Sequence, residues 1–285
     1  MNFRTDLAIE RQEYHEKEKL DGVLSSCKSE DGVKITTIEI INSQGEKLIG
    51  KPIGRYITLE TEKLYKSSQV FTAVCYALSR ELRDLLPSEG TVLVAGLGNE
   101  DITPDALGPK SVGKLFATRH IGSELAESLG LGELRSVAGI VPGVLGKTGI
   151  ETVEIISGVV EKISPCCVIV IDALASRETA RLGNTVQLCD TGVSPGSGVG
   201  NRRKGINAET LGVPVIAVGV PTVVDAATIL RERMGNYLRR KGVSEVERKK
   251  ILEEAEENNG QVLFVTPKGI DELVHRAGET VAEAI

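Results

Sequence analysis

Two aspartates, Asp105 and Asp172, lie where α/β proteins commonly place reacting side chains. Asp172 directly follows the apolar run 167–171, and Asp105 lies in the loop and first helical turn after the apolar run 91–95. Open α/β sheets place their sites beyond the carboxyl ends of the strands. If the two strands are neighbours, the two carboxyl groups meet at one edge of the sheet.

Two carboxyl groups in one pocket do not easily ionise together, so they share a proton and titrate as a pair. The ionised member of such a pair can activate water, and the protonated member can polarise a carbonyl group. A helix N-terminus favours a charged Asp105, and an apolar strand end favours a protonated Asp172. The pattern alone also fits two structural roles, in which Asp105 complements a helix dipole and Asp172 caps a turn.

Other motifs are weaker indications of chemistry. The sequence Asp190-Thr191-Gly192 spells the D-T-G of pepsin-like proteases, but it occurs once in an α/β pattern and reads as a turn. The glycine-rich segment 194–205 lacks the Lys-Ser/Thr ending of a phosphate-binding loop. It fits a basic substrate loop or a plain surface loop. The three histidines, His15, His120 and His275, do not have the spacing of metal ligands.

Short apolar strands alternate with helices over most of the chain. The predicted strands include 91–95, 136–141, 167–171, 185–189 and 213–218, and the predicted helices include those near 105–119, 149–163 and 222–241. This alternation predicts an α/β fold with a mainly parallel twisted sheet and helices on both faces. Residues 33–60 read as a β-rich elaboration with a turn at 42–45. We expect a single domain over residues 7–285.

Composition excludes several classes of protein. The 285 residues contain no apolar run of the roughly 18 residues that span a membrane, and a net charge of −6 gives no general case for binding nucleic acid. The five cysteines are odd in number and include no C-x-x-C pair, which argues against structural disulfides and a thiolate zinc site. A reducing cytoplasm is the expected location.

Several long motifs resemble one family, the spore germination proteases, which degrade small acid-soluble spore proteins when spores germinate. The matching segments are G-R-Y-I-T-L-E (54–60), G-L-G-N-E-D-I-T-P-D-A-L-G-P (96–109), T-R-H (118–120), P-G-V-L-G-K-T-G-I-E-T (142–152), V-I-D-A-L-A-S-R (170–177), D-T-G-V-S-P-G-S-G-V-G-N-R-R-K (190–204) and T-L-G-V-P-V-I-A-V-G-V-P-T-V-V-D-A (210–226). The resemblance implies an atypical aspartic endopeptidase whose essential acids are Asp105 and Asp172.

A more distant resemblance is to the hydrogenase-maturation endopeptidases, which recognise nickel through two carboxylates and a histidine after a Ser-Pro pair. Here Ser194-Pro195 is followed by Gly196. Because nickel favours imidazole ligands, we expect neither a metal nor a cofactor. A nickel-recognising endopeptidase and a phosphorylase-like enzyme without proteolytic activity are the alternatives.

The resemblance also implies that the protein is a zymogen that processes itself. The family cuts its substrates in a T-E-F-A-x-E motif, between the acid and the large apolar residue, and residues 5–10 read T-D-L-A-I-E. We therefore predict cleavage between Asp6 and Leu7, which removes residues 1–6 as a propeptide.

The basic cluster at Arg202, Arg203 and Lys204 is a candidate for binding the acids of the substrate, because guanidinium pairs well with carboxylate. A solvated basic turn is the alternative. The expected partners are small acid-soluble spore proteins and the zymogen itself as substrates, in a homotetramer that binds neither nucleic acid nor membrane. The implied location is the cytoplasm of the forespore or spore core.

Overall fold

The computed structural model describes residues 5–14, 20–61, 68–121, 123–128, 130–131, 134–196, 204–256 and 263–285. Its strands are β1 (Val23–Glu30), β2 (Val33–Ile40), β3 (Gly54–Glu60), β4 (Val92–Gly96), β5 (Val137–Ile140), β6 (Cys167–Ser176), β7 (Thr185–Cys189), β8 (Val215–Asp225) and β9 (Phe264–Val265). Its helices are α1 (Ala8–Tyr14), α2 (Ser43–Ile49), α3 (Ser68–Leu85), α4 (Leu107–Val112), α5 (Ser123–Ser128), α6 (Leu145–Thr148), α7 (Thr152–Ile163), α8 (Ala208–Leu211), α9 (Ala226–Arg240), α10 (Glu245–Glu256) and α11 (Ile270–Ala284), with the 3-10 turns η1 (Thr103–Asp105) and η2 (Thr179–Arg181).

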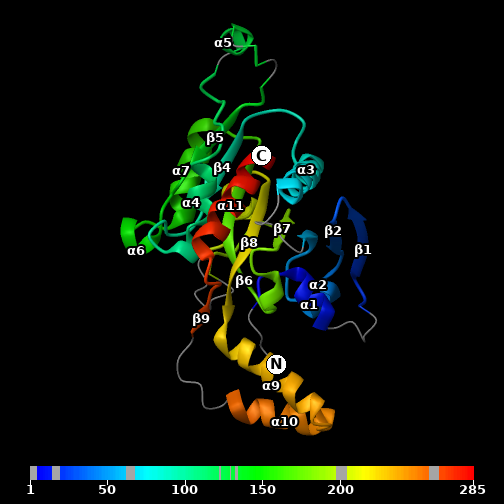
Figure 1. The fold of residues 1–285 in the computed structure, drawn as a ribbon. Coiled ribbons are helices and arrows are strands. Elements are labelled where there is room, and N and C mark those ends of the chain that lie inside the picture. The colour runs from blue at the N-terminus through cyan, green and yellow to red at the C-terminus, as the bar shows by residue number, and fades with distance from the viewer. Residues whose placement is uncertain are drawn as a thin grey trace.

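The described strands form one mixed sheet in the order β1-β2-β3-β7-β8-β6-β4-β5, with β9 pairing on β8 (Figure 1). Strands β8, β6, β4 and β5 run parallel, whereas β1, β2, β3 and β7 pair in antiparallel fashion. The predicted α/β class is confirmed. The β-rich elaboration expected at 33–60 is an antiparallel meander that begins earlier, at Val23.

Helices cover both faces of the sheet, as predicted. On one face Ile169 and Ile171 of β6 belong to a core with α3, α4 and α11. On the other face Val168 and Val170 pack with α7 and α8. Because side chains alternate between the two faces along a strand, Asp172 points to the same face as Val168 and Val170. The acid therefore lies on the face of α7 and α8, within β6, which continues to Ser176 beyond the strand end predicted at residue 171.

Two local predictions were wrong. The turn expected at 42–45 is the start of helix α2, where the Asn42 Oδ1 accepts hydrogen bonds from the N–H groups of Gln44 and Gly45. Asparagine favours a turn and a helix N-cap alike, so its local preference does not separate the two. The helix expected near 105–119 is shorter, because η1 precedes it and α4 ends at Val112.

Helices α9 and α10 pack on each other beyond the end of the sheet (Figure 1). Of the helices in the described ranges, none combines the length and apolar character that crossing a membrane requires.

Candidate active site

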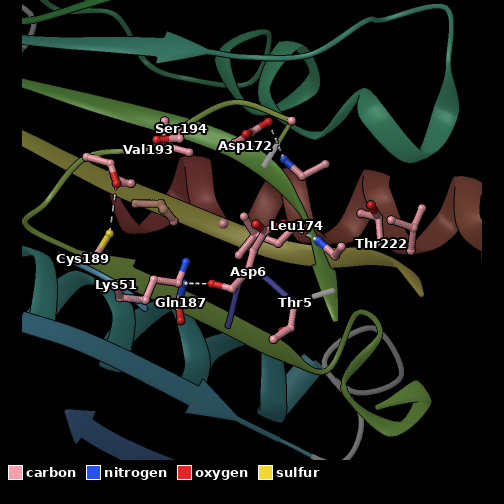
Figure 2. Close-up of a pocket in the computed structure, with 18 of the residues that line it drawn as sticks. Thr5, Asp6, Lys51, Asp172, Leu174, Gln187, Cys189, Val193, Ser194 and Thr222 are labelled. Atoms are coloured by element: carbon pink, nitrogen blue, oxygen red, sulfur yellow. Dashed lines mark hydrogen bonds between the residues drawn. The ribbon is translucent and has the colours of Figure 1, made fainter. Parts of the chain in front are cut away.

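The carboxyl end of β4 lies beside the middle of β6, because the two strands pair in parallel up to Gly96 and Ile171 and β6 then continues to Ser176. Asp105 ends η1, just beyond β4, and Asp172 is the first residue of β6 after its pairing with β4 stops. Both residues line one cavity of about 1420 Å³. Figure 2 shows Asp172 in this cavity. The structure therefore brings together the two acids that the sequence pattern singled out.

A tight loop holds Asp105 in place. The Asn99 N–H donates a hydrogen bond to Asp105 Oδ2 at 2.7 Å. Gly98 adopts a φ of +109°, and a Cβ there would come within 1.9 Å of the Asp105 carbonyl oxygen. Only glycine fits this close approach of the two backbone segments. The G-L-G-N turn after β4 thus fixes the direction of the Asp105 carboxylate.

Asp172 lies in an environment that favours its protonated form. The residue is 9% exposed. Burial raises the pKa of the Asp172 carboxyl well above its ordinary value, and the nearby charges of Asp105 and Asp6 raise it further. One hydrogen bond opposes this shift, because the Ala173 N–H donates to Asp172 Oδ1 at 2.9 Å.

The N-terminal segment enters the same cavity, which Thr5 and Asp6 also line. The Asp6 N–H donates to the Ala175 carbonyl at 2.9 Å, and the Ala175 N–H donates to Asp6 Oδ2 at 2.9 Å. Leu7 is fully buried in an apolar cluster beneath the meander. The segment is therefore held by β6 on one side of Leu7 and by apolar packing at Leu7 itself.

The side chain of Gln187, on β7, contacts the segment at two backbone groups. Its Nε2 donates to the Asp6 carbonyl at 3.1 Å, and its Oε1 accepts from the Ala8 N–H at 2.7 Å. In the view of Figure 2, Asp6 lies between Asp172 and Gln187. The backbone on both sides of Leu7 is thus fixed by one amide group.

A second acid of the segment, Glu10, is anchored at the loop after β6. Its side chain is 1% exposed and accepts hydrogen bonds from the N–H groups of Arg177 at 2.7 Å and Glu178 at 2.9 Å. The Thr5 hydroxyl and the Arg181 guanidinium, the latter at 3.3 Å, complete its surroundings. Asp6 and Glu10 therefore have separate binding positions, four residues apart.

Arg181 links the segment to the sheet. Its guanidinium, 8% exposed, pairs with Glu13 at 2.6 Å and with Glu60 of β3 at 2.9 Å, in addition to Glu10. Lys51 also lines the cavity. Burial lowers the pKa of the Lys51 ammonium, and the negative charge of Asp6 opposes that shift.

The remaining predicted residues are accounted for as follows. Arg202 and Arg203 lie outside the described residues, and Lys204 is exposed. Asp190 of the D-T-G motif accepts a hydrogen bond from the Arg55 N–H at 2.8 Å, which fits its interpretation as a turn residue. Within the described ranges, no three His, Cys, Asp or Glu side chains are grouped as metal ligands would be.

Gln187 and Arg181 were missed at the level of sequence. Gln187 carried one usable signal, since it is a polar residue in the otherwise apolar strand T-V-Q-L-C, where a buried amide needs partners. Arg181 lies in a polar loop, and its partners are up to 171 residues away (181 − 10), so no local pattern marks it.

Comparisons with known proteins agree on one family. A family profile described as "Germination protease" matches residues 4–243. A germination protease of Clostridium perfringens is 43% identical over 307 aligned positions, which cover 100% of this chain and 94% of the relative. That of Caldanaerobacter subterraneus subsp. tengcongensis is 42% identical, with coverages of 100% and 93%. That of Priestia megaterium is 45% identical, with coverages of 85% and 68%.

Proposed function

The chain belongs to the germination protease family, and on that premise we propose that this peptidase is an atypical aspartic endopeptidase with Asp105 and Asp172 as its catalytic pair. The observation that carries the proposal is their convergence in one cavity, with Asp172 buried and its pKa raised. The Asn99 N–H donates to Asp105, and such a donor favours an ionised carboxylate. We therefore assign the charged carboxylate of the pair to Asp105 and the protonated carboxyl group to Asp172.

This division of charge suits hydrolysis of an amide. Asp105 accepts a proton from water as the water oxygen attacks the carbonyl carbon of the substrate. Asp172 donates a hydrogen bond to the carbonyl oxygen, on which negative charge develops. When the carbon–nitrogen bond breaks, the leaving amine takes the proton that Asp105 accepted from water, so Asp105 is charged again and Asp172 keeps its own proton. No step requires a metal ion.

We further propose that the protein is made as a zymogen that cuts itself between Asp6 and Leu7. Asp6 lines the cavity that holds both catalytic acids, and its carbonyl is the one that this cut would attack. Mild acid is the expected trigger, because protonation relieves the repulsion among Asp6, Asp105 and Asp172. Processing releases residues 1–6.

Intact-mass analysis after mild acidification tests the zymogen and the catalytic pair together. The wild-type protein is expected to lose the mass of M-N-F-R-T-D within the incubation. The Asp172→Asn protein serves as the control and is expected to remain whole. A new N-terminus at another residue, or equal processing of both proteins, would refute the proposal.

The substrate acids are expected to bind where Asp6 and Glu10 bind, with the basic cluster at Arg202 and Arg203 as a further candidate. The Glu10 position supplies two backbone N–H donors and the Arg181 guanidinium. These groups suit a substrate with acids four residues apart. The family implies small acid-soluble spore proteins of the spore core as such substrates, and it also implies a homotetramer.

Removing the charge of Glu10 is expected to slow self-processing. Glu10→Gln leaves the shape of the side chain but weakens three charge-assisted hydrogen bonds, each of which is worth roughly 1.5–3 kcal/mol. A tenfold or greater slowing is expected, followed by intact mass. Glu13→Gln is the matched control, since Glu13 also pairs with Arg181 but lies beyond the predicted motif. Equal slowing in both variants would contradict a specific Glu10 position.

A further inference from the structure

The side chain of Gln187 contacts the backbone on both sides of Leu7, next to the predicted scissile bond. The two backbone groups that it contacts, the Asp6 carbonyl and the Ala8 N–H, lie on either side of Leu7. The Asp6 carbonyl belongs to the peptide bond between Asp6 and Leu7. Because a backbone N–H can only donate and a carbonyl can only accept, these contacts fix the orientation of the Gln187 amide. The Nε2 donor therefore points at the carbonyl oxygen.

Gln187 and Asp172 lie on a line that crosses the sheet from strand to strand, with one strand between them. Asp172 of β6 is paired with Gly219 of β8, and Gly219 is paired with Gln187 of β7. Residues paired across neighbouring strands direct their side chains to the same face of the sheet. Two strand spacings of ~4.8 Å therefore place Asp172 and Gln187 about 10 Å apart. Gly219 has no side chain, and a Cβ there would lie 2.5 Å from Leu174. The Leu174 side chain therefore occupies the space above this glycine.

We propose that Gln187 is a catalytic residue that donates a hydrogen bond to the scissile carbonyl and fixes the register of the bound peptide through the N–H two residues further on. This inference rests on the proposed function, because it takes the Asp6–Leu7 bond as the bond that is cut. The same contacts would hold a separate substrate segment that lies over β8, between Asp172 of β6 and Gln187 of β7. The segment that fits has an acid followed by a large apolar residue and a small residue.

The role follows from the charge that develops during attack. As the water oxygen bonds to the carbonyl carbon, the π electrons move to the carbonyl oxygen, and a donor already in place stabilises the resulting negative charge. When the tetrahedral intermediate collapses, the carbonyl re-forms and the amine of Leu7 leaves with the proton that Asp105 took from water. Gln187 neither gains nor loses a proton in these steps. Its buried side chain, 6% exposed, needs little reorganisation as the charge forms.

The test compares single-turnover self-processing in wild-type, Gln187→Glu and Gln187→Met proteins. Gln187→Met removes donor and acceptor and is expected to slow cleavage by about 10²–10³-fold, the usual effect of losing such a donor. Gln187→Glu keeps the acceptor for Ala8 and regains a donor only when its carboxyl is protonated. The cleavage rate of Gln187→Glu is therefore expected to approach the wild-type rate as the pH falls. A purely structural defect would not follow the protonation of the new side chain.

Thr58→Val is the matched control. Thr58 of β3 is paired with Gln187 across the sheet. Its buried hydroxyl has no hydrogen-bond partner among the described residues. This variant is expected to process at the wild-type rate. Hydrogen exchange of the Ala8 amide in Gln187→Glu shows whether the segment stays bound.

The outcomes separate this inference from the function on which it rests. If wild type processes itself and Asp172→Asn does not, but both Gln187 variants lie within about threefold of wild type at every pH, Gln187 has no catalytic role. A constant deficit of Gln187→Glu across pH likewise overturns the donor role. If wild type itself fails to cut after Asp6, the proposed function is wrong.

Discussion

Asp172→Asn is expected to slow peptide cleavage about 10³-fold, because the amide cannot exchange a proton with Asp105 during turnover. Initial rates on a synthetic T-E-F-A-S-E peptide measure the effect, with protein that begins at Leu7. Asp105→Asn is expected to show a similar loss. Asp101→Asn is the control on the same loop, since its exposed side chain pairs with Lys147 rather than lining the cavity. Near wild-type rates in either catalytic variant would remove the basis of the mechanism.

The same Asp172→Asn substitution is expected to stabilise the folded protein at neutral pH. The pKa of Asp172 is raised in the folded state, so above the ordinary value of about 3.9 the unfolded chain releases a proton that the folded chain retains. Stability therefore falls as the pH rises through this range, and asparagine, which stays neutral, avoids the loss. Each unit of raised pKa corresponds to roughly 1.4 kcal/mol.

Urea denaturation of Asp172→Asn and wild type at several pH values tests this expectation. The advantage of the variant is expected to be largest near neutral pH and to disappear below about pH 4, where both side chains are neutral. Asp101→Asn is expected to change the free energy of unfolding by less than about 0.5 kcal/mol. An advantage that does not vary with pH would show that Asp172 is charged in the folded protein.

Arg181→Leu is expected to destabilise the protein by about 3–5 kcal/mol, the usual result of removing one partner from a buried ion pair. The guanidinium is 8% exposed, and its removal takes the shared cation from Glu10, Glu13 and Glu60, of which Glu60 keeps its pair with Lys34. The loss is expected to shrink in acid, because protonation of the carboxylates relieves their repulsion. The midpoint and slope of urea unfolding measure it.

Arg276→Leu is the matched control for Arg181→Leu. Arg276 pairs with Glu272 and Glu279 on helix α11, but its side chain is 49% exposed. Exposed pairs contribute about 0–1 kcal/mol, so this variant is expected to unfold close to wild type. Similar losses in the two arginine variants would indicate that burial of the Arg181 cluster has no special effect.

The proximity of Asp105 and Asp172 was predictable from sequence because its signal is local. A run such as C-V-I-V-I has apolar residues on both faces, which marks a central parallel strand, so the acid after the run was expected at the carboxyl edge. The strand β6 in fact continues to Ser176, and Asp172 lies where its pairing with β4 stops. Two such runs end near Asp105 and Asp172. The pairing of β4 with β6 was an assumption at the level of sequence, and the structure confirmed that the strands are neighbours.

The contacts of the N-terminal segment were not predictable in the same way. Ala8 and Gln187 are 179 residues apart, and Glu10 and Arg177 are 167 apart, so no periodicity connects them. Helix α2 illustrates a different limit. Its first residues read equally well as a turn, and the burial of Ile49 against the apolar cluster of Leu7 favours the helix.

The full burial of Leu7 bears on what would follow the proposed cut behind Asp6. If the chain is severed behind Asp6, the new end at Leu7 remains tethered through Glu10 to the loop after β6. Such an end competes with incoming chains at an effective concentration on the order of millimolar. A foreign segment would then have to compete with the enzyme's own cut terminus for the same contacts.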